Sequence, residues 1–118
     1  MSDGFQAVFA ELRDIMLRAG QGMTVARDES GDLELRTPGI DPKTGKPGWF
    51  GIVNMKKTYV AYHLMPLYAD PRLASCVSLA LAKRKHGKTC FSFTKPDPVL
   101  FAQLERLTAI ALASVLSR

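Results

Sequence analysis

The segment that most constrains the fold is residues 49–65, WFGIVNMKKTYVAYHLM, near the middle of the chain. Its two halves, 49–55 and 58–65, are rich in β-branched and aromatic residues and meet at a Lys56-Lys57 pair, which suits an exposed turn. Both halves are apolar on both sides for much of their length, as in central strands with one face under helices and the other partly covered. The sequence therefore predicts a sheet with this antiparallel pair at its centre.

Two segments near the ends of the chain have helical spacing. Residues 3–19 repeat apolar side chains at intervals of three and four, with Ser2 or Asp3 as the cap and Gly20 as the end. In the last segment Asp97 caps and Pro98 opens a helix whose second half, AIALASVL, is apolar almost all round. Such a helix must be covered on more than one side by this chain or by a second copy, so we expect a homodimer.

Two further β segments extend the predicted sheet. Residues 22–38, GMTVARDESGDLELRTP, read as a hairpin turning at Ser30-Gly31-Asp32, with Arg27, Glu34 and Arg36 toward solvent. Residues 89–94 read as another strand, with Phe91 and Phe93 on one face. Between the hairpins, the prolines and glycines of residues 38–48 predict a surface loop that acts as a lid or as a connector.

The segment between residues 70 and 87 is predicted to be helical. Asp70-Pro71 is a helix-start signal, Ser78 is a possible break, and Gly87 is the natural end. Lys83, Arg84 and Lys85 would then lie in the last turn, where cations complement the helix dipole.

The predicted order is therefore helix, four strands, helix, strand, helix, in a single domain over residues 1–118. The hairpins make the sheet mainly antiparallel, so the fold class is α+β. We expect about five strands with the helices packed on one face.

Composition indicates an ordinary globular protein of the cytoplasm. The start MSDGFQAVFAELRD lacks the basic and then apolar order of a signal peptide, and no apolar run is expected to approach the length of a membrane span. Cys76 and Cys90 have no metal-binding spacing and are expected to be buried thiols. The net charge of +5 favours anionic partners, but the basic residues are spread along the chain, so no nucleic-acid partner is expected.

Three stretches resemble a known family: PGWFGIVNMKKTYVAYHLMP, GKTCFSF and DPVLFAQLERL. Together they are similar to the YdhG-like family of small bacterial proteins of unknown function, over roughly residues 35–116. The resemblance implies the same α+β fold. Some members are described as frataxin-like iron chaperones, which implies iron delivery to cluster assembly.

The carboxylates that such an iron role needs are sparse in this chain. Hard iron is held by clustered oxygen ligands, and two small groups of acids are available: Asp3, Glu11 and Asp14, and then Asp28, Glu29 and Asp32. Arginines separate the first group, and the second group fits a solvated hairpin turn. We predict no metal site and no cofactor.

A candidate binding site is predicted around the second central strand. Trp49, Tyr62 and Tyr68 either line a pocket or close the uncovered sheet face. His63 either binds a ligand or is a hydrogen-bonded structural histidine. Lys83 and Lys88 either hold an anion together or are ordinary surface lysines.

The leading hypothesis is a non-enzymatic binding module that takes a small anionic ligand or a protein partner through these residues. The alternatives are the iron role above and a small enzyme that uses His63 or Cys90. In the enzyme reading Lys88 lowers the pKa of Cys90, whereas a buried inert thiol is the opposing interpretation.

Overall fold

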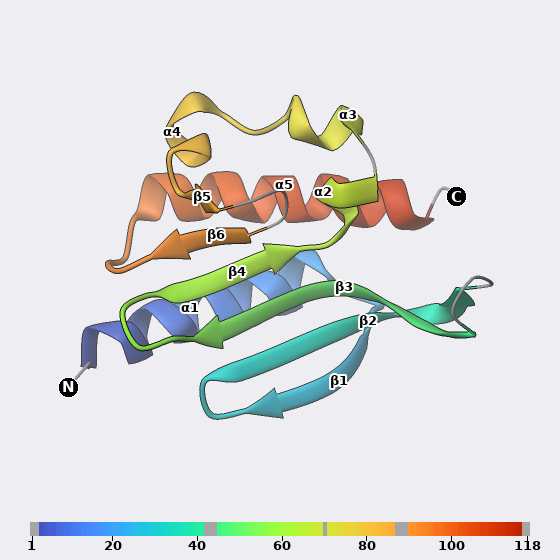
Figure 1. Ribbon diagram of the computed structural model, residues 1–118, viewed down its shortest axis with the longest axis horizontal. Coiled ribbons are helices and arrows are strands. Elements are labelled where there is room, and N and C mark those ends of the chain that lie inside the picture. Colours follow the sequence, from blue (N-terminus) through green and yellow to red (C-terminus); the bar gives the residue numbers. More distant parts are fainter. Residues whose placement is uncertain (1–2, 42–44, 70, 87–89, 117–118) are drawn as a thin grey trace.

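The computed structural model describes residues 3–41, 45–69, 71–86 and 90–116. Over these ranges the strands form one antiparallel sheet of six strands in the order β1-β2-β3-β4-β6-β5. The two long helices lie together on one face of that sheet (Figure 1). The elements are α1 (Asp3–Ala19), β1 (Thr24–Glu29), β2 (Asp32–Asp41), β3 (Lys46–Met55), β4 (Val60–Leu64), α2 (Pro66–Ala69), α3 (Pro71–Ala74), α4 (Leu79–Ala82), β5 (Lys85–His86), β6 (Cys90–Phe93) and α5 (Pro98–Leu116).

The predicted α+β class is confirmed, with the central pair formed by β3 and β4. The expected sheet of about five strands is extended by the two-residue strand β5 at one edge. The radius of gyration is 13.5 Å. A compact chain of this length is expected at about 13.5 Å, so the chain folds as one compact body.

Helix α1 spans the predicted residues and buries one face. Val8, Leu12 and Met16 are fully buried, at the spacing of four that aligns side chains along a helix. The helix ends where Gly20 donates its backbone N–H to the carbonyl of Met16, at 2.9 Å. Its apolar face packs on β3, β4 and α5.

The prediction of an irregular loop over residues 38–48 is wrong for most of that stretch. Strand β2 continues to Asp41 and β3 begins at Lys46, so the two form a long hairpin arm. Regular pairing is interrupted between Arg36 and Ile40, which accommodates the prolines and glycines. The Thr37 hydroxyl accepts a hydrogen bond from the Gly48 backbone N–H at 3.2 Å and so bridges the interruption.

A second irregularity lies at the base of that arm. Leu35 pairs with Gly51 while the next residue, Arg36, pairs with Trp49, so Phe50 is the extra residue of a β-bulge. Phe50 is fully buried. A Cβ atom at Gly51 would collide with the side chain of Met16, so α1 packs directly on the strand backbone there.

The helix predicted between residues 70 and 87 forms only as short pieces. The described part of this segment holds two single-turn helices, α3 and α4, and then the strand β5. The single-turn helix α2 comes just before them, and all three short helices pack against α5. Ser78 caps α4, because its hydroxyl accepts the Leu81 backbone N–H at 3.1 Å, so the break predicted at Ser78 is confirmed. Lys83 is the C-cap residue of α4, and Lys85 belongs to β5 and not to a helical turn. The predicted cap Asp70 and the predicted end Gly87 lie outside the described residues.

Helix α5 begins as predicted. Asp97 accepts the Leu100 backbone N–H at 3.1 Å, and Pro98 is the first helical residue. Leu104 and Ala111 are fully buried against the sheet side of the molecule. In the described part of the chain α5 is the one helix long and apolar enough to cross a membrane, over Pro98–Val115, by length and composition alone. That window includes the charged residues Glu105 and Arg106, and its buried side packs into the core of this domain.

Candidate functional site

The sheet has one covered face and one open face, and strand alternation decides which residues lie on each. Val53, Tyr62 and Phe91 are aligned across β3, β4 and β6 and are fully buried under the helices. Their neighbours Ile52, His63 and Cys90, which form the next aligned row, are each only partly buried. Because successive side chains in a strand point to opposite faces, this second row lies on the open face.

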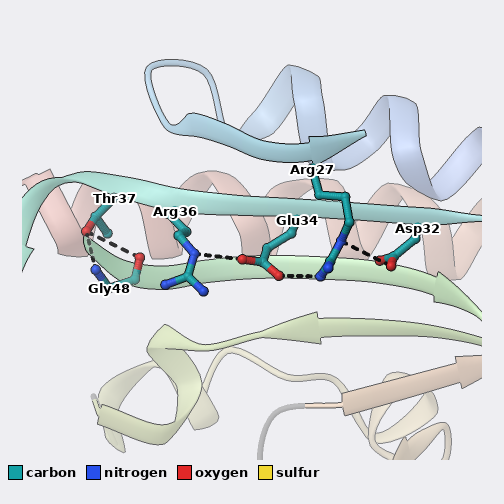
Figure 2. Close-up of polar contacts among 6 residues, drawn as sticks. All are labelled: Arg27, Asp32, Glu34, Arg36, Thr37 and Gly48. Atoms are coloured by element: carbon teal, nitrogen blue, oxygen red, sulfur yellow. Dashed lines mark hydrogen bonds and ion pairs between the residues drawn. The ribbon is translucent and has the colours of Figure 1, made fainter. Parts of the chain in front are cut away.

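A row of paired charges crosses the open face on β1 and β2 (Figure 2). Arg27 contacts Asp32 at 3.1 Å and Glu34 at 2.6 Å, and Arg36 donates from Nε to the second carboxylate oxygen of Glu34 at 2.6 Å. Glu34 is only 7% exposed, while both arginines remain partly exposed. Two arginines and two carboxylates cancel, so the charge row has no net charge.

Trp49 continues this row onto β3. The guanidinium carbon of Arg36 lies 5.2 Å from the centroid of the Trp49 ring, which is the geometry of a cation–π contact. Trp49 is nevertheless 52% exposed, so the indole is held from one side and open to solvent on the other. Trp49 and Ile52 flank the bulge residues Phe50 and Gly51 on β3. We call Trp49, Ile52 and His63 the tryptophan patch.

Tyr62, another residue of the predicted binding site, is a core residue. Its side chain has no exposed surface, and its hydroxyl lies 2.6 Å from the Thr108 hydroxyl on α5. Thr108 in turn donates to the Leu104 carbonyl at 2.7 Å, so the Tyr62 hydroxyl is the donor of the pair. Burial raises the pKa of Tyr62 far above its ordinary value. This phenol is occupied within the fold and has no free face for a ligand.

His63 and Cys90 stand opposite each other on neighbouring strands, which the sequence did not reveal. Burial and the nearby charge of Lys56 both lower the pKa of His63, which favours the neutral imidazole. Burial raises the pKa of the Cys90 thiol, and Lys56 offsets only part of that effect. A protonated thiol beside a neutral imidazole is not an activated nucleophile, so this geometry gives no support to the enzyme hypothesis.

The remaining predicted site residues lie elsewhere. Lys83 is exposed at the end of α4, in a shallow groove against the start of α5 that also contains Arg84 and Asp97. This groove is formed by elements on the helical side of the molecule, so Lys83 is separate from the tryptophan patch. Tyr68 belongs to α2, but its side chain is outside the described part of the structure, as is all of Lys88.

Three of the six carboxylates considered for iron, Asp14, Asp28 and Asp32, contact arginines. Asp28 accepts two hydrogen bonds from Arg13, at 2.9 and 2.6 Å, and this contact lowers the pKa of Asp28. Asp32 pairs with Arg27 in the charge row. Over the residues that the structure describes, no group of three or more His, Cys, Asp or Glu side chains could hold a metal ion. This donor set does not favour the iron hypothesis.

The sequence analysis did not predict the ion pairs that link the charged residues of β1 and β2 to one another. Arg27, Glu34 and Arg36 were each predicted to face solvent, and this is wrong for Glu34, which is only 7% exposed. The three residues share one face as a linked row that supports Trp49. The available signal was the alternation of charged and apolar residues in Asp32-Leu33-Glu34-Leu35-Arg36, which places two acids and one base on the same face.

Comparison with known proteins found no relative of this chain. No protein-family model, no curated protein and no solved structure matches this chain.

Proposed function

We propose that this protein is a non-enzymatic binding module of the cytoplasm, which acts by docking a protein partner on its open sheet face. The partner to which we commit is a second copy of the chain. The observation that carries the proposal is the exposed Trp49, held in place by Arg36 beside the partly buried Ile52 and His63.

The tryptophan patch has the chemistry of an interface hot spot. Tryptophan and arginine are the residues most enriched among those that dominate binding energies, particularly when they are central and held in a fixed geometry. Here Arg36 is fixed by Glu34, and Glu34 is fixed by Arg27, so the indole is positioned before any partner arrives. A preorganised anchor loses less conformational entropy on binding.

Charge also favours this face over the outer side of α5 for self-association. In a two-fold dimer, a residue that lies near the symmetry axis is close to the same residue of the second copy. On the open face the charge row is internally neutral, so this row adds no net repulsion between two copies. On α5 the same axis would bring two copies of Arg106 together, which is unfavourable.

The experiment is sedimentation equilibrium of the full chain, with interference detection, for the wild type, Trp49→Ala and Val25→Ala. Val25 is the matched control, because it is a similarly exposed apolar residue, at 50%, but lies on the edge strand β1. We expect a wild-type dimer and a dissociation constant at least about a hundredfold higher for Trp49→Ala, since each interface loses two hot-spot side chains.

For Val25→Ala we expect a change of less than about twofold in the dissociation constant, as for a surface substitution outside an interface. Circular dichroism should show that both variants remain folded. The proposal would be contradicted if the wild type stays monomeric at all concentrations. It would also be contradicted if Val25→Ala raises the dissociation constant as much as Trp49→Ala does.

A further inference from the structure

A groove on the helical side of the molecule is independent of the open sheet face. It lies between the outer surface of α5 and the loop before α4, and its volume is about 670 Å³. Its walls include Cys76 and Ser78 from the loop, and Val99, Ala102 and Ile110 from α5. Small-molecule sites commonly have volumes of about 300–1,000 Å³ and mainly apolar walls with a few polar groups, and this groove fits that description.

The polar groups of the groove are hydrogen-bond donors. Arg106 lines it and is exposed, and over the described residues it forms no ion pair, whereas Arg13 and Arg18 on α1 bind Asp28 and Glu105. Beside it, the Ser78 hydroxyl donates to Oε1 of Gln103. That bond leaves the amide N–H groups of Gln103 available, with no partner among the residues described.

The apolar wall runs from this polar centre toward the start of α5. Val99 is 68% exposed and Ala102 is exposed one turn later, so the groove wall from Pro98 to Ala102 is apolar and the polar groups Gln103 and Arg106 follow it. Eight residues of helix span about 12 Å. An extended chain advances about 1.2 Å per bond, so roughly ten bonds cover that distance. The nearby carboxylate Asp97 is committed to capping α5, through its bond to the Leu100 N–H.

We infer that this groove binds a medium-chain carboxylate, an amphiphile with one anionic head and one unbranched acyl chain. The head accepts hydrogen bonds from the Arg106 guanidinium and the Gln103 amide, and the chain covers Val99 and Ala102. Arginine matches a carboxylate with two parallel bonds, and the exposed apolar wall gains from being covered. This inference goes beyond the proposed function, since it uses none of the residues on the open sheet face.

The first experiment is calorimetric titration of the full chain with octanoate, decanoate and dodecanoate, all below their micelle concentrations. Each half-buried methylene should strengthen binding about twofold, so dodecanoate should bind about sixteenfold more tightly than octanoate. Decanol, which lacks the charge, and inorganic phosphate, which lacks the chain, should each bind at least tenfold more weakly than decanoate. Equal binding of decanol or of phosphate would overturn the inference.

Variants test the two halves of the site separately. Arg106→Gln should weaken decanoate binding at least tenfold, because it removes a charge-assisted pair of hydrogen bonds. Val99→Asp should weaken it by a similar factor through lost apolar contact and like-charge repulsion. Lys57→Gln, in the exposed β3–β4 turn, removes the same unit of charge and should change binding less than twofold. An equal loss in Lys57→Gln and Arg106→Gln would contradict a specific head-group contact.

The location is tested by Cys76, which lines the groove and has an exposed thiol, so the prediction that this thiol is buried is wrong. Saturating decanoate should slow the reaction of Cys76 with a maleimide at least fivefold, measured by peptide mapping, while the partly buried Cys90 serves as the internal reference. Unchanged reactivity of Cys76 in the presence of bound decanoate would show that the ligand lies elsewhere. Failure of this site leaves the Trp49 dimer experiment unaffected, so the two ideas are tested independently.

Discussion

The open sheet face and the outer face of α5 use similar residues in opposite ways. On the sheet, Arg27 and Arg36 are each bonded to Glu34, and this network holds one exposed aromatic ring. On α5, Arg106 has no acidic partner within the described chain and stands beside exposed apolar side chains. The first arrangement satisfies its charges within the fold, and the second leaves a charge available to a ligand.

This difference indicates how to distinguish arginines that stabilise the fold from arginines that are available to bind a ligand. Neither exposure nor residue type separates them, since the side chain of Arg27 is itself 42% exposed. The distinguishing property is whether the guanidinium already has a carboxylate. The following predictions test that distinction, in order of decreasing expected effect.

Removing the shared carboxylate of the charge row should have the largest effect. Glu34→Ala removes the carboxylate that Arg27 and Arg36 share, at a site that is 7% exposed, while Arg27 keeps its contact with Asp32. We expect the free energy of unfolding to fall by about 2 kcal/mol, below the range for fully buried pairs because both arginines can turn to water. Urea unfolding measures this change.

Arg106→Gln is the matched control for Glu34→Ala. Because Arg106 is exposed and forms no ion pair with the described residues, its loss should change the free energy of unfolding by less than about 0.5 kcal/mol. Equal destabilisation by the two substitutions would break the comparison between the faces.

The hydrogen bond between Thr108 and Tyr62, in the core between the two faces, should contribute to the free energy of unfolding. Thr108→Val keeps the side-chain shape but leaves the buried Tyr62 hydroxyl without an acceptor, which should cost about 1.5 kcal/mol of unfolding free energy. Tyr62→Phe removes the hydroxyl itself and should cost less, about 1 kcal/mol, because Thr108 keeps its bond to Leu104. The reverse order in urea unfolding would mean that the Tyr62 hydroxyl has another partner.

The contact between Arg36 and Trp49 should be visible in fluorescence, because Trp49 is the only tryptophan of the chain. Arg36→Gln removes the cation over the ring, an interaction of about 0.5–1 kcal/mol at an exposed site. We expect faster acrylamide quenching of the Trp49 emission in this variant. Arg18→Gln, which breaks the exposed ion pair with Glu105 on the helical side, should leave quenching unchanged. Equal quenching in wild type and Arg36→Gln would show that Arg36 does not position the indole.

The smallest expected effect is a pH dependence at His63. Its pKa in the folded protein lies below the ordinary value, through burial and the charge of Lys56. Above about pH 6.5 the imidazole is neutral in both states and has no effect; as the pH falls, the unfolded chain takes up the proton first and stability is lost. The wild type should therefore lose more unfolding free energy between pH 8 and pH 5 than His63→Gln does. Parallel pH profiles for the two proteins would show that the fold does not perturb this histidine.

The sequence predicted the elements whose local signals agree with one another. Helix α5 has a cap at Asp97, a proline at its first position and apolar periodicity, and it begins where predicted. The segment over residues 70–87 lacked that agreement. Leu73, Val77 and Leu81 have helical spacing, but the cap at Ser78 starts a new turn, and contacts with α5 select the broken form.

The candidate site was less predictable than the helices. In an apolar strand, the sequence alone does not show which side chains face the helices, because that depends on how the strand pairs with its neighbours. Tyr62 and His63 are adjacent, and composition alone did not show which of them faces the helices. The alternation of Val60, Tyr62 and Leu64 was present in the sequence, but Ala61 between them is also almost fully buried, which weakens the contrast. The opposition of His63 and Cys90, and of Arg27 and Glu34, exists only once the strands are paired.

The close contact between Gly51 and Met16 links two positions that are far apart in the sequence. Any side chain at position 51 occupies space that the end of the Met16 side chain now fills, and it would also lie close to the His63 carbonyl, so a substitution there requires Met16 to move. In related sequences we expect the two sites to change together, with an alanine at position 51 accompanied by a shorter residue at position 16. The substitutions that this sequence tolerates are therefore limited by the contact of a helix with a strand backbone, as well as by the surfaces proposed to bind a partner or a ligand.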